Sequence, residues 1–321
     1  MSRFKIQSVI VSPSGWLFSA TTAKNFSPVL SFKSPEVHGG VEHIVTYESD
    51  AANLQIAWQD FYNEVEQFIR AMSFYTSSYL AFHDWRSLII DSKCDVALIS
   101  TFSRTYGTAI GLYSQNEVNN VSILIEKSNQ DEKLKNFLYN YKMALLTDAP
   151  ETQNTYEKYL ILAAESLAGK IVNNEGKKNL DRGRLKQIIG DYLHDHFFQH
   201  VDPLTGNNIR NLHMHEGESP ASKPSETIKL ISKFKQFIKD EYAIDGMHEI
   251  GETKSPTRGL YCDDGGLVMA RAVSSTSDLS QISIEDTLDK EAVIKWLLQG
   301  NFEILSISNG EGKEIYANMI T

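Results

Sequence analysis

The spacing of apolar residues changes along this chain, and that change limits the folds it can adopt. From about residue 129 to residue 245, apolar residues recur every three or four positions, which is the spacing of one helix face. Four segments of about 15 to 20 residues have this spacing and predict a helical bundle. Their apolar positions are Leu134, Phe137, Leu138 and Tyr141; Tyr159 to Leu162, Leu167 and Ile171; Leu185, Ile188, Ile189, Tyr192 and Phe197; and Leu230, Ile231, Phe234, Phe237 and Ile238.

Residues 1–127 predict a strand-rich module with one long helix. Short runs of β-favouring residues alternate there with turns of Pro, Ser and Gly. The helix is expected after a cap at Asp50, because apolar residues from Leu54 to Met72 recur at three-and-four spacing. The expected strands cover residues 4–11, 16–19, 29–32, 41–46, 96–101, 108–113 and 121–126.

The remaining residues, 246–321, return to mixed structure. A loop rich in Gly, Thr, Ser and Asp is followed by a predicted helix near Ile284 to Leu298 and a final strand around Phe302 to Ser306. The sequence therefore predicts an α+β chain in three parts, with a strand-rich module over 1–127, an all-α bundle over 128–245 and a short mixed tail.

Composition excludes several classes of protein. The formal net charge of −10 argues against a protein that covers duplex DNA or an anionic membrane with most of its surface. Cys94 and Cys262 are far apart and form no CxxC or Cys/His group, so neither a disulfide framework nor a structural zinc site is expected. No apolar run is long enough to span a membrane, and the first residues do not form a signal peptide. We expect a cytoplasmic protein that makes no membrane contact.

One part of the predicted bundle is locally basic. Between residues 170 and 186, six basic residues outnumber Glu175 and Asp181, and further lysines are expected on the polar side of the last helix, among them Lys235. A local positive patch is what a polyanion such as RNA requires, although lysines that merely solvate helix faces remain an alternative. The RNA-contact candidates are Lys177, Lys178, Arg182, Arg184 and Lys186.

The stretch from residue 207 to residue 217, NNIRNLHMHEG, holds the candidate catalytic residues. RNA cleavage without a metal needs a base near the 2′-hydroxyl, a proton donor near the leaving 5′-oxygen and positive charge at the phosphate. Histidine, here His215, can hold or release a proton under cellular conditions, and arginine, here Arg210, offers a charged planar fork for phosphate oxygens. Asn211 cannot transfer a proton but can fix a ring by hydrogen bonding.

The spacing within this stretch also predicts a dimer. If residues 208 to 215 are helical, Arg210 and His215 point about 140° apart, so one copy cannot easily direct both at one phosphate. Two copies related by a twofold axis can do so in a shared cleft. A homodimer is therefore expected.

The six residues from Arg210 to His215, Arg-Asn-Leu-His-Met-His, resemble the RNxxxH motif of the HEPN (higher eukaryotes and prokaryotes nucleotide-binding) superfamily. The resemblance covers roughly residues 129 to 245 and implies a helical bundle with the motif before the last helix. It also implies that Arg210 binds the phosphate, that Asn211 orients and that His215 is the acid or base, whereas His213 has no role. More loosely, the chain resembles ApeA-like or MauJ-like bacterial proteins.

This resemblance implies a metal-independent endoribonuclease of a bacterial defence or toxin-type system. Such an enzyme cleaves RNA by transphosphorylation and uses no cofactor. It would act as a dimer, with an antitoxin or regulatory protein as a further partner. The alternative is a non-catalytic HEPN module that binds or scaffolds a defence or toxin–antitoxin complex.

Other groups in the sequence suggest weaker alternatives. His196 and His200 lie one helical turn apart and could hold zinc, but the glutamate of an HExxH motif is missing. The pair His194-Asp195 resembles the doublet of HD phosphohydrolases, without a convincing set of further metal ligands. The run from Cys262 to Leu267, CDDGGL, is more typical of an acidic turn than of a phosphate-binding loop.

Overall fold

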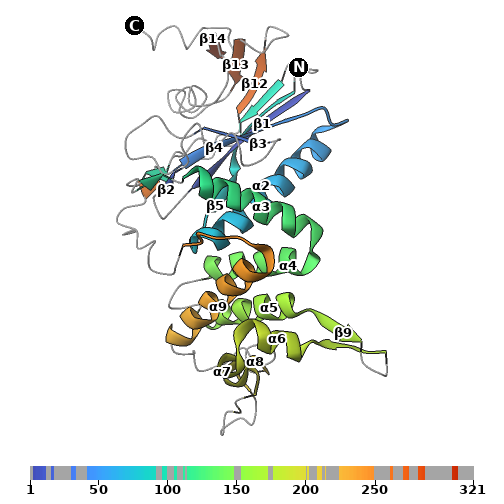
Figure 1. The fold of residues 1–321 in the computed structure, drawn as a ribbon. Coiled ribbons are helices and arrows are strands. Elements are labelled where there is room, and N and C mark those ends of the chain that lie inside the picture. The colour runs from blue at the N-terminus through green and yellow to red at the C-terminus, as the bar shows by residue number, and fades with distance from the viewer. Residues whose placement is uncertain are drawn as a thin grey trace. The chain divides into compact units, whose positions relative to one another are not determined.

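The computed structural model shows a chain of the mixed α+β class that divides into two compact units (Figure 1). The first unit comprises Met1–Gln67, Leu80–Asn119 and Ser255–Thr321, and the second comprises Phe68–Tyr79 and Asn120–Lys254. The structure describes residues 3–11, 16–17, 30–33, 42–91, 96–99, 105–106, 111–112, 114–147, 153–172, 176–199, 201, 208–211, 214, 224–248, 261–262, 270–274, 281–285 and 306–309.

An eight-stranded sheet forms the first unit, in the order β14-β13-β12-β6-β5-β1-β4-β3. All neighbouring strands are antiparallel except β13 and β14, which are parallel. Two shorter pairs, β2 with β8 and β7 with β11, lie outside this sheet. The strands are β1 Phe4–Val11, β2 Trp16–Leu17, β3 Leu30–Lys33, β4 Glu42–Ser49, β5 Ala81–Asp91, β6 Val96–Ile99, β7 Thr105–Tyr106, β8 Gly111–Leu112, β11 Tyr261–Cys262, β12 Ala270–Ser274, β13 Gln281–Glu285 and β14 Ser306–Asn309.

The sheet confirms the strand expected over residues 4–11, where every second residue from Phe4 to Ile10 is buried. Three strands of this sheet come from the C-terminal segment. Strand β12 pairs with β6, β13 pairs with β12, and β14 pairs with β13. The helix expected near Ile284 to Leu298 is wrong at its start, because Ile284 lies in β13. Residues 286–298 lie outside the described part of the chain.

Helix α2, Leu54–Thr76, is the long helix expected after Asp50. The part of its apolar stripe in the first unit packs on the sheet. The ring of Phe61 lies 6.0 Å from that of Tyr47 on β4 and 6.0 Å from that of Phe82 on β5. The periodic apolar spacing therefore identified both the helix and the face that packs.

Helix α3, Gln115–Gln130, replaces the strand predicted for residues 121–126. Ser114 and Glu117 form a reciprocal cap: the Glu117 amide donates to Ser114 Oγ at 3.3 Å and the Ser114 amide donates to Glu117 Oε2. Its buried residues are three or four positions apart, namely Val118, Val121, Leu124 and Ser128. The β-favouring run VSILIE misled the prediction, because the cap that marks the start of the helix lies seven positions before this run.

The second unit is built from helices around an aromatic core. Phe137 on α4 lies 5.0 Å from Phe74 on α2 and 5.2 Å from Phe234 on α9, both in edge-on geometry. Helix α9 starts at Pro224, since proline suits the first turn of a helix. The helices are α4 Glu132–Leu146, α5 Gln153–Ala168, α6 Arg182–Ile189, α7 Asp191–His194, α8 Ile209–Asn211 and α9 Pro224–Tyr242.

The third expected helix is broken. Helix α6 ends at Gly190, which has φ 80° and ψ 160°, and α7 continues from Asp191 into a π-helical turn, η2, over Asp195–Gln199. Only glycine adopts this backbone conformation easily. Tyr192 was predicted to extend a buried stripe, but it lies beyond the break and is 61% exposed.

Replacing Gly190 by Ala is therefore expected to destabilise the protein by about 1–3 kcal/mol, because an added Cβ strains this conformation. Space is not the cause, since the nearest atom to that Cβ is 3.9 Å away. The matched control is Gly183→Ala inside α6, which is expected to be neutral or to stabilise by up to about 1 kcal/mol. Urea unfolding of both variants measures the difference, and equal effects would contradict the strain argument.

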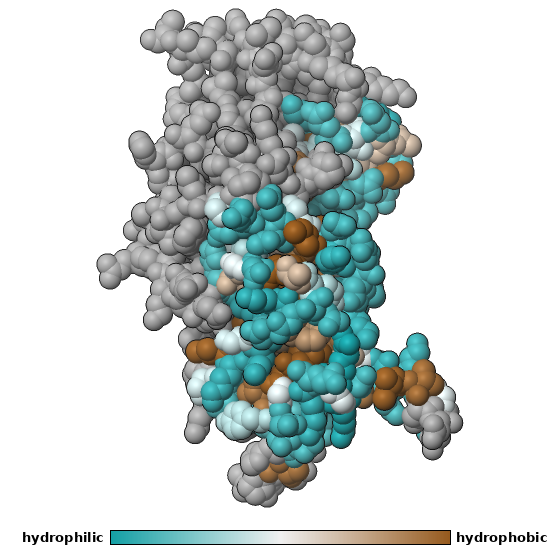
Figure 2. Space-filling view, in the orientation of Figure 1, coloured by the Kyte–Doolittle hydropathy of each residue, from teal (hydrophilic) through white to brown (hydrophobic). Residues whose placement is uncertain are grey.

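A short hairpin follows α5 and carries exposed apolar and basic residues. Strands β9 Lys170–Val172 and β10 Lys178–Leu180 pair only with each other among the described residues (Figure 1). Ile171, predicted to lie in the second helix of the bundle, is on β9 and is 52% exposed, and Val172 is 64% exposed. Figure 2 shows hydrophobic surface on this hairpin. Within the described residues, no helix is long and apolar enough to cross a membrane.

Candidate functional site

The short helix α8 carries Arg210 and Asn211, and Asn208 fixes its position. The Asn208 Oδ1 atom accepts a hydrogen bond from the Asn211 amide at 2.8 Å, which caps the helix. The Asn208 Nδ2 atom donates to the Phe198 carbonyl on η2 at 2.9 Å, and residue 208 also forms a β-bridge with Val201. The first half of the motif is therefore anchored to η2.

Arg210 is held by a carboxylate on another helix. Its Nε atom donates to Glu165 Oε1 on α5 at 2.8 Å, and its Nη1 atom donates to Asn211 Oδ1 at 3.3 Å. The Arg210 side chain is 33% exposed and that of Glu165 is 17% exposed. The Nη2 atom has no hydrogen bond to any described residue. Arg210 thus has a fixed orientation and keeps N–H groups available for an anion.

The structure brings Arg210 and Asn211 together but does not describe the rest of the motif. Asn211, expected to orient a catalytic group, accepts its side-chain hydrogen bond from Arg210. Both His213 and His215 lie outside the described residues. Of the stretch expected to be helical, α8 covers Ile209–Asn211.

Sequence reasoning missed two residues of this site, Asn208 and Glu165. A signal for Asn208 existed, because an asparagine three positions before Asn211 is a typical cap. Glu165 carried no signal, since it is 45 positions from Arg210 and lies on a different helix. A resemblance to a motif identifies the motif residues but not their supporting contacts.

The structure divides the five basic RNA-contact candidates into two groups. Lys177, Lys178 and Arg182 are exposed on the β9–β10 hairpin and at the start of α6. The other two are in ion pairs: Arg184 Nη2 lies 3.0 Å from Glu241 Oε1, and Lys186 Nζ lies 3.3 Å from Asp191 Oδ1. All three residues of the first group are exposed to solvent, where a polyanion can contact them.

The positive side predicted for α9 needs a correction. Lys235 was expected among its solvent-facing lysines, but it is buried. The apolar face of α9 is wide enough to include position 235 beside the buried Ile231 and Phe234.

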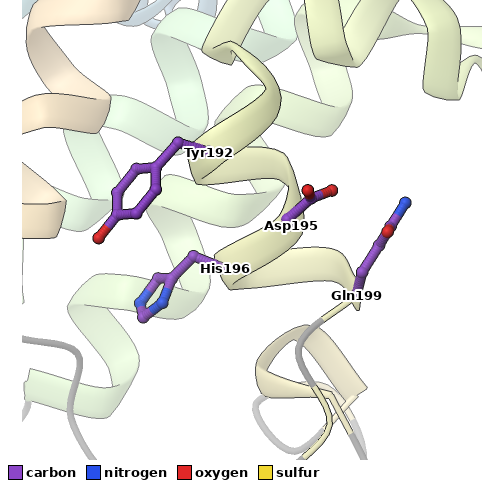
Figure 3. Close-up of a pocket in the computed structure, with 4 residues that line it drawn as sticks. All are labelled: Tyr192, Asp195, His196 and Gln199. Atoms are coloured by element: carbon purple, nitrogen blue, oxygen red, sulfur yellow. The ribbon is translucent and has the colours of Figure 1, made fainter.

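A pocket of about 460 Å³ lies beside η2. Among the described residues, Tyr192, Asp195, His196 and Gln199 line it. Figure 3 shows the two aromatic rings on one side of the helix, and Asp195 and Gln199 on the other. The rings of Tyr192 and His196 are nearly parallel, at 9°, with centroids 6.4 Å apart.

Glu226 and Lys229 on α9 hold the Tyr192 side chain. Burial alone would raise the pKa of Glu226, but hydrogen bonds from the Tyr192 hydroxyl and the Lys229 ammonium lower this pKa below its ordinary value. The Lys229 Nζ atom lies 3.4 Å from Glu226 Oε1 and 5.0 Å from the centre of the Tyr192 ring. The lowered pKa keeps Glu226 ionised at neutral pH, so it attracts the nearby cation and the hydroxyl proton.

Metal ligation finds no support among the described side chains, in which no group of three His, Cys, Asp or Glu could hold an ion. His194 is buried, with Nδ1 3.3 Å from Asp195 Oδ1 and its ring 5.8 Å from that of Phe198. His200, Cys94 and residues 263–267 lie outside the described part of the chain. Cys262 lies on β11.

The chain matches no family model, and neither the curated proteins nor the solved structures contain a match to it.

Proposed function

We propose that this chain is a metal-independent, HEPN-like endoribonuclease of a bacterial defence or toxin-type system. The observation that supports it best is the Arg210 guanidinium, fixed by Glu165 yet partly exposed, within a motif that resembles RNxxxH. A preorganised cation of this kind suits a phosphate that gains negative charge during cleavage. The helices of residues 128–245 would form the HEPN-like bundle, and the protein would act in the cytoplasm.

In this proposal each residue of the motif has a separate task. The 2′-oxygen attacks the neighbouring phosphorus and loses its proton to a base, while the P–O5′ bond breaks and the 5′-oxygen takes a proton from an acid. The products carry a 2′,3′-cyclic phosphate and a 5′-hydroxyl. His215 from each of two copies would supply the base and the acid. Arg210 would stabilise the pentacoordinate phosphate, with Asn211 and Glu165 keeping its fork in place.

The active site would be shared by two copies of the chain. The exposed Lys177, Lys178 and Arg182 would extend the contact with the RNA backbone, and the ion-paired Arg184 and Lys186 would contribute less. An antitoxin or regulatory protein would restrain the activity.

The ion pair also favours a second function. Arg210 is paired with Glu165 of the same chain at 2.8 Å, and attaching α8 to α5 would be a sufficient role for this ion pair. The bundle would then be a non-catalytic module that binds or scaffolds a defence or toxin–antitoxin complex.

An RNA cleavage assay in excess chelator distinguishes the two functions. We expect wild-type protein to cut single-stranded RNA and to leave 2′,3′-cyclic phosphate ends. His215→Ala should reduce the rate by at least about 100-fold, the lower range for loss of general acid–base catalysis. Absence of cleavage by wild type, or equal cleavage by His215→Ala, would contradict the ribonuclease and leave the scaffold. Cleavage by wild type without chelator that is lost when chelator is added would indicate a metal enzyme.

A further inference from the structure

Tyr192, in the aromatic pair beside η2, is exposed yet restricted in orientation. Tyr192 is 61% exposed, but its hydroxyl is hydrogen-bonded to Glu226 and its ring contacts the Lys229 ammonium. The nearly parallel His196 ring extends the same aromatic surface. Ordering a flexible side chain costs binding free energy, and here the protein's own contacts already restrict the tyrosine before a ligand arrives.

The pocket has the size and chemistry for a nucleoside. A volume of about 460 Å³ lies in the range of small-molecule sites. Among the described residues, its lining holds two aromatic rings, a carboxylate and an amide, without an aliphatic side chain. Flat rings suit stacking, and Asp195 and Gln199, on the other side of the helix, can hydrogen-bond to a neighbouring nucleotide of the same strand.

We propose that this pocket binds a nucleobase of single-stranded RNA, which stacks on Tyr192 and His196. The proposal deepens the ribonuclease function, because it assigns RNA as the ligand and gives the enzyme a base-contacting subsite. Aromatic side chains are the usual platforms for unpaired bases.

The pocket and the motif are parts of one hydrogen-bonded assembly. Residue Phe198 of the pocket-bearing turn accepts from Asn208, and Asn208 caps the helix that carries Arg210. A strand of RNA that stacks a base at Tyr192 would therefore be positioned by an element coupled to the phosphate-binding arginine. This arrangement would set which nucleotide is presented for cleavage.

Binding of short single-stranded oligonucleotides with 2′-O-methyl riboses tests the pocket without cleavage, because the attacking hydroxyl is blocked. Fluorescence anisotropy is measured for wild type, Tyr192→Ala, Tyr192→Leu and Tyr192→Phe. We expect Ala and Leu to weaken binding about 5- to 150-fold, as for loss of one stacked base, and Phe to stay within about threefold of wild type.

Tyr139→Ala is the matched control. Tyr139 is an exposed tyrosine on α4 whose ring also contacts a cation, with Arg70 Cζ 5.0 Å from its centre. Its loss should leave binding unchanged. The proposal is overturned if wild type binds none of the oligonucleotides, or if either Tyr192→Ala or Tyr192→Leu binds as tightly as wild type.

The binding result and the cleavage result separate the two proposals. Tyr192-dependent binding by a protein that cuts no RNA would support the pocket and contradict the ribonuclease. Cleavage by wild type with binding and base preference unchanged in Tyr192→Ala would retain the ribonuclease and overturn the pocket.

Discussion

Replacing Arg210 by Ala is expected to lower the RNA cleavage rate about 10²- to 10³-fold, as when one preorganised donor to a developing negative charge is lost. Arg210→Lys should lose nearly as much, because an ammonium cannot bond Glu165 and a phosphate with one planar fork. Single-turnover cleavage of a labelled RNA measures both rates. Thermal unfolding of each variant is the necessary control, since Arg210 also joins α8 to α5.

Glu165 variants separate positioning from charge. Glu165→Gln keeps an oxygen that can accept from Arg210 Nε and should reduce cleavage by less than about tenfold, whereas Glu165→Ala removes the acceptor and should reduce it further. If Arg210→Ala and Glu165→Ala both lower stability while wild-type protein shows no cleavage to lose, the ion pair is structural. The scaffold function would then be favoured.

Mixing wild type with an excess of His215→Ala protein tests the shared active site. Each mixed dimer lacks one of the two histidines that supply the base and the acid, so the activity per wild-type chain should fall. A mixture in which the wild-type chains keep their full activity would contradict a site built from both copies.

Sequence patterns predicted the elements whose signals are local and mutually consistent. Helix α9 has both a proline at its first turn and a regular apolar stripe, and β1 is a β-favouring run followed by the turn-forming residues Ser-Pro-Ser-Gly. Helix α3 was missed because the β-favouring run VSILIE outweighed the cap at Ser114 and Glu117. The break at Gly190 was missed because apolar residues at helical spacing occur both before and after it, and this spacing does not indicate that Gly190 has a positive φ.

Long-range contacts were beyond the reach of the sequence patterns. Strands β12 and β6 pair although more than half of the chain separates them in sequence. The spacing of apolar residues within a strand does not indicate which strand pairs with it. The same limit applies to the site. The type and spacing of Arg210 and Asn211 indicated phosphate chemistry, but only the fold brings Glu165 to the guanidinium.

Phe137→Ala is expected to destabilise the helical unit by about 3–5 kcal/mol, the usual cost of removing a buried aromatic ring. Phe137 is fully buried, and its ring contacts Phe74, Tyr141 and Phe234. The cavity would lie among α2, α4 and α9, so three helices lose packing at once. Urea unfolding followed by far-ultraviolet circular dichroism measures the loss.

Tyr139→Ala is the control on the same helix, because Tyr139 is 43% exposed and its removal leaves no internal cavity. It should change stability by less than about 1 kcal/mol. Equal losses in the two variants would mean that helix propensity, not core packing, dominates at α4. A specific loss in Phe137→Ala would instead show that the aromatic cluster holds the helices together. Because α5 packs against α4, that cluster also supports the helix that presents Glu165 to Arg210.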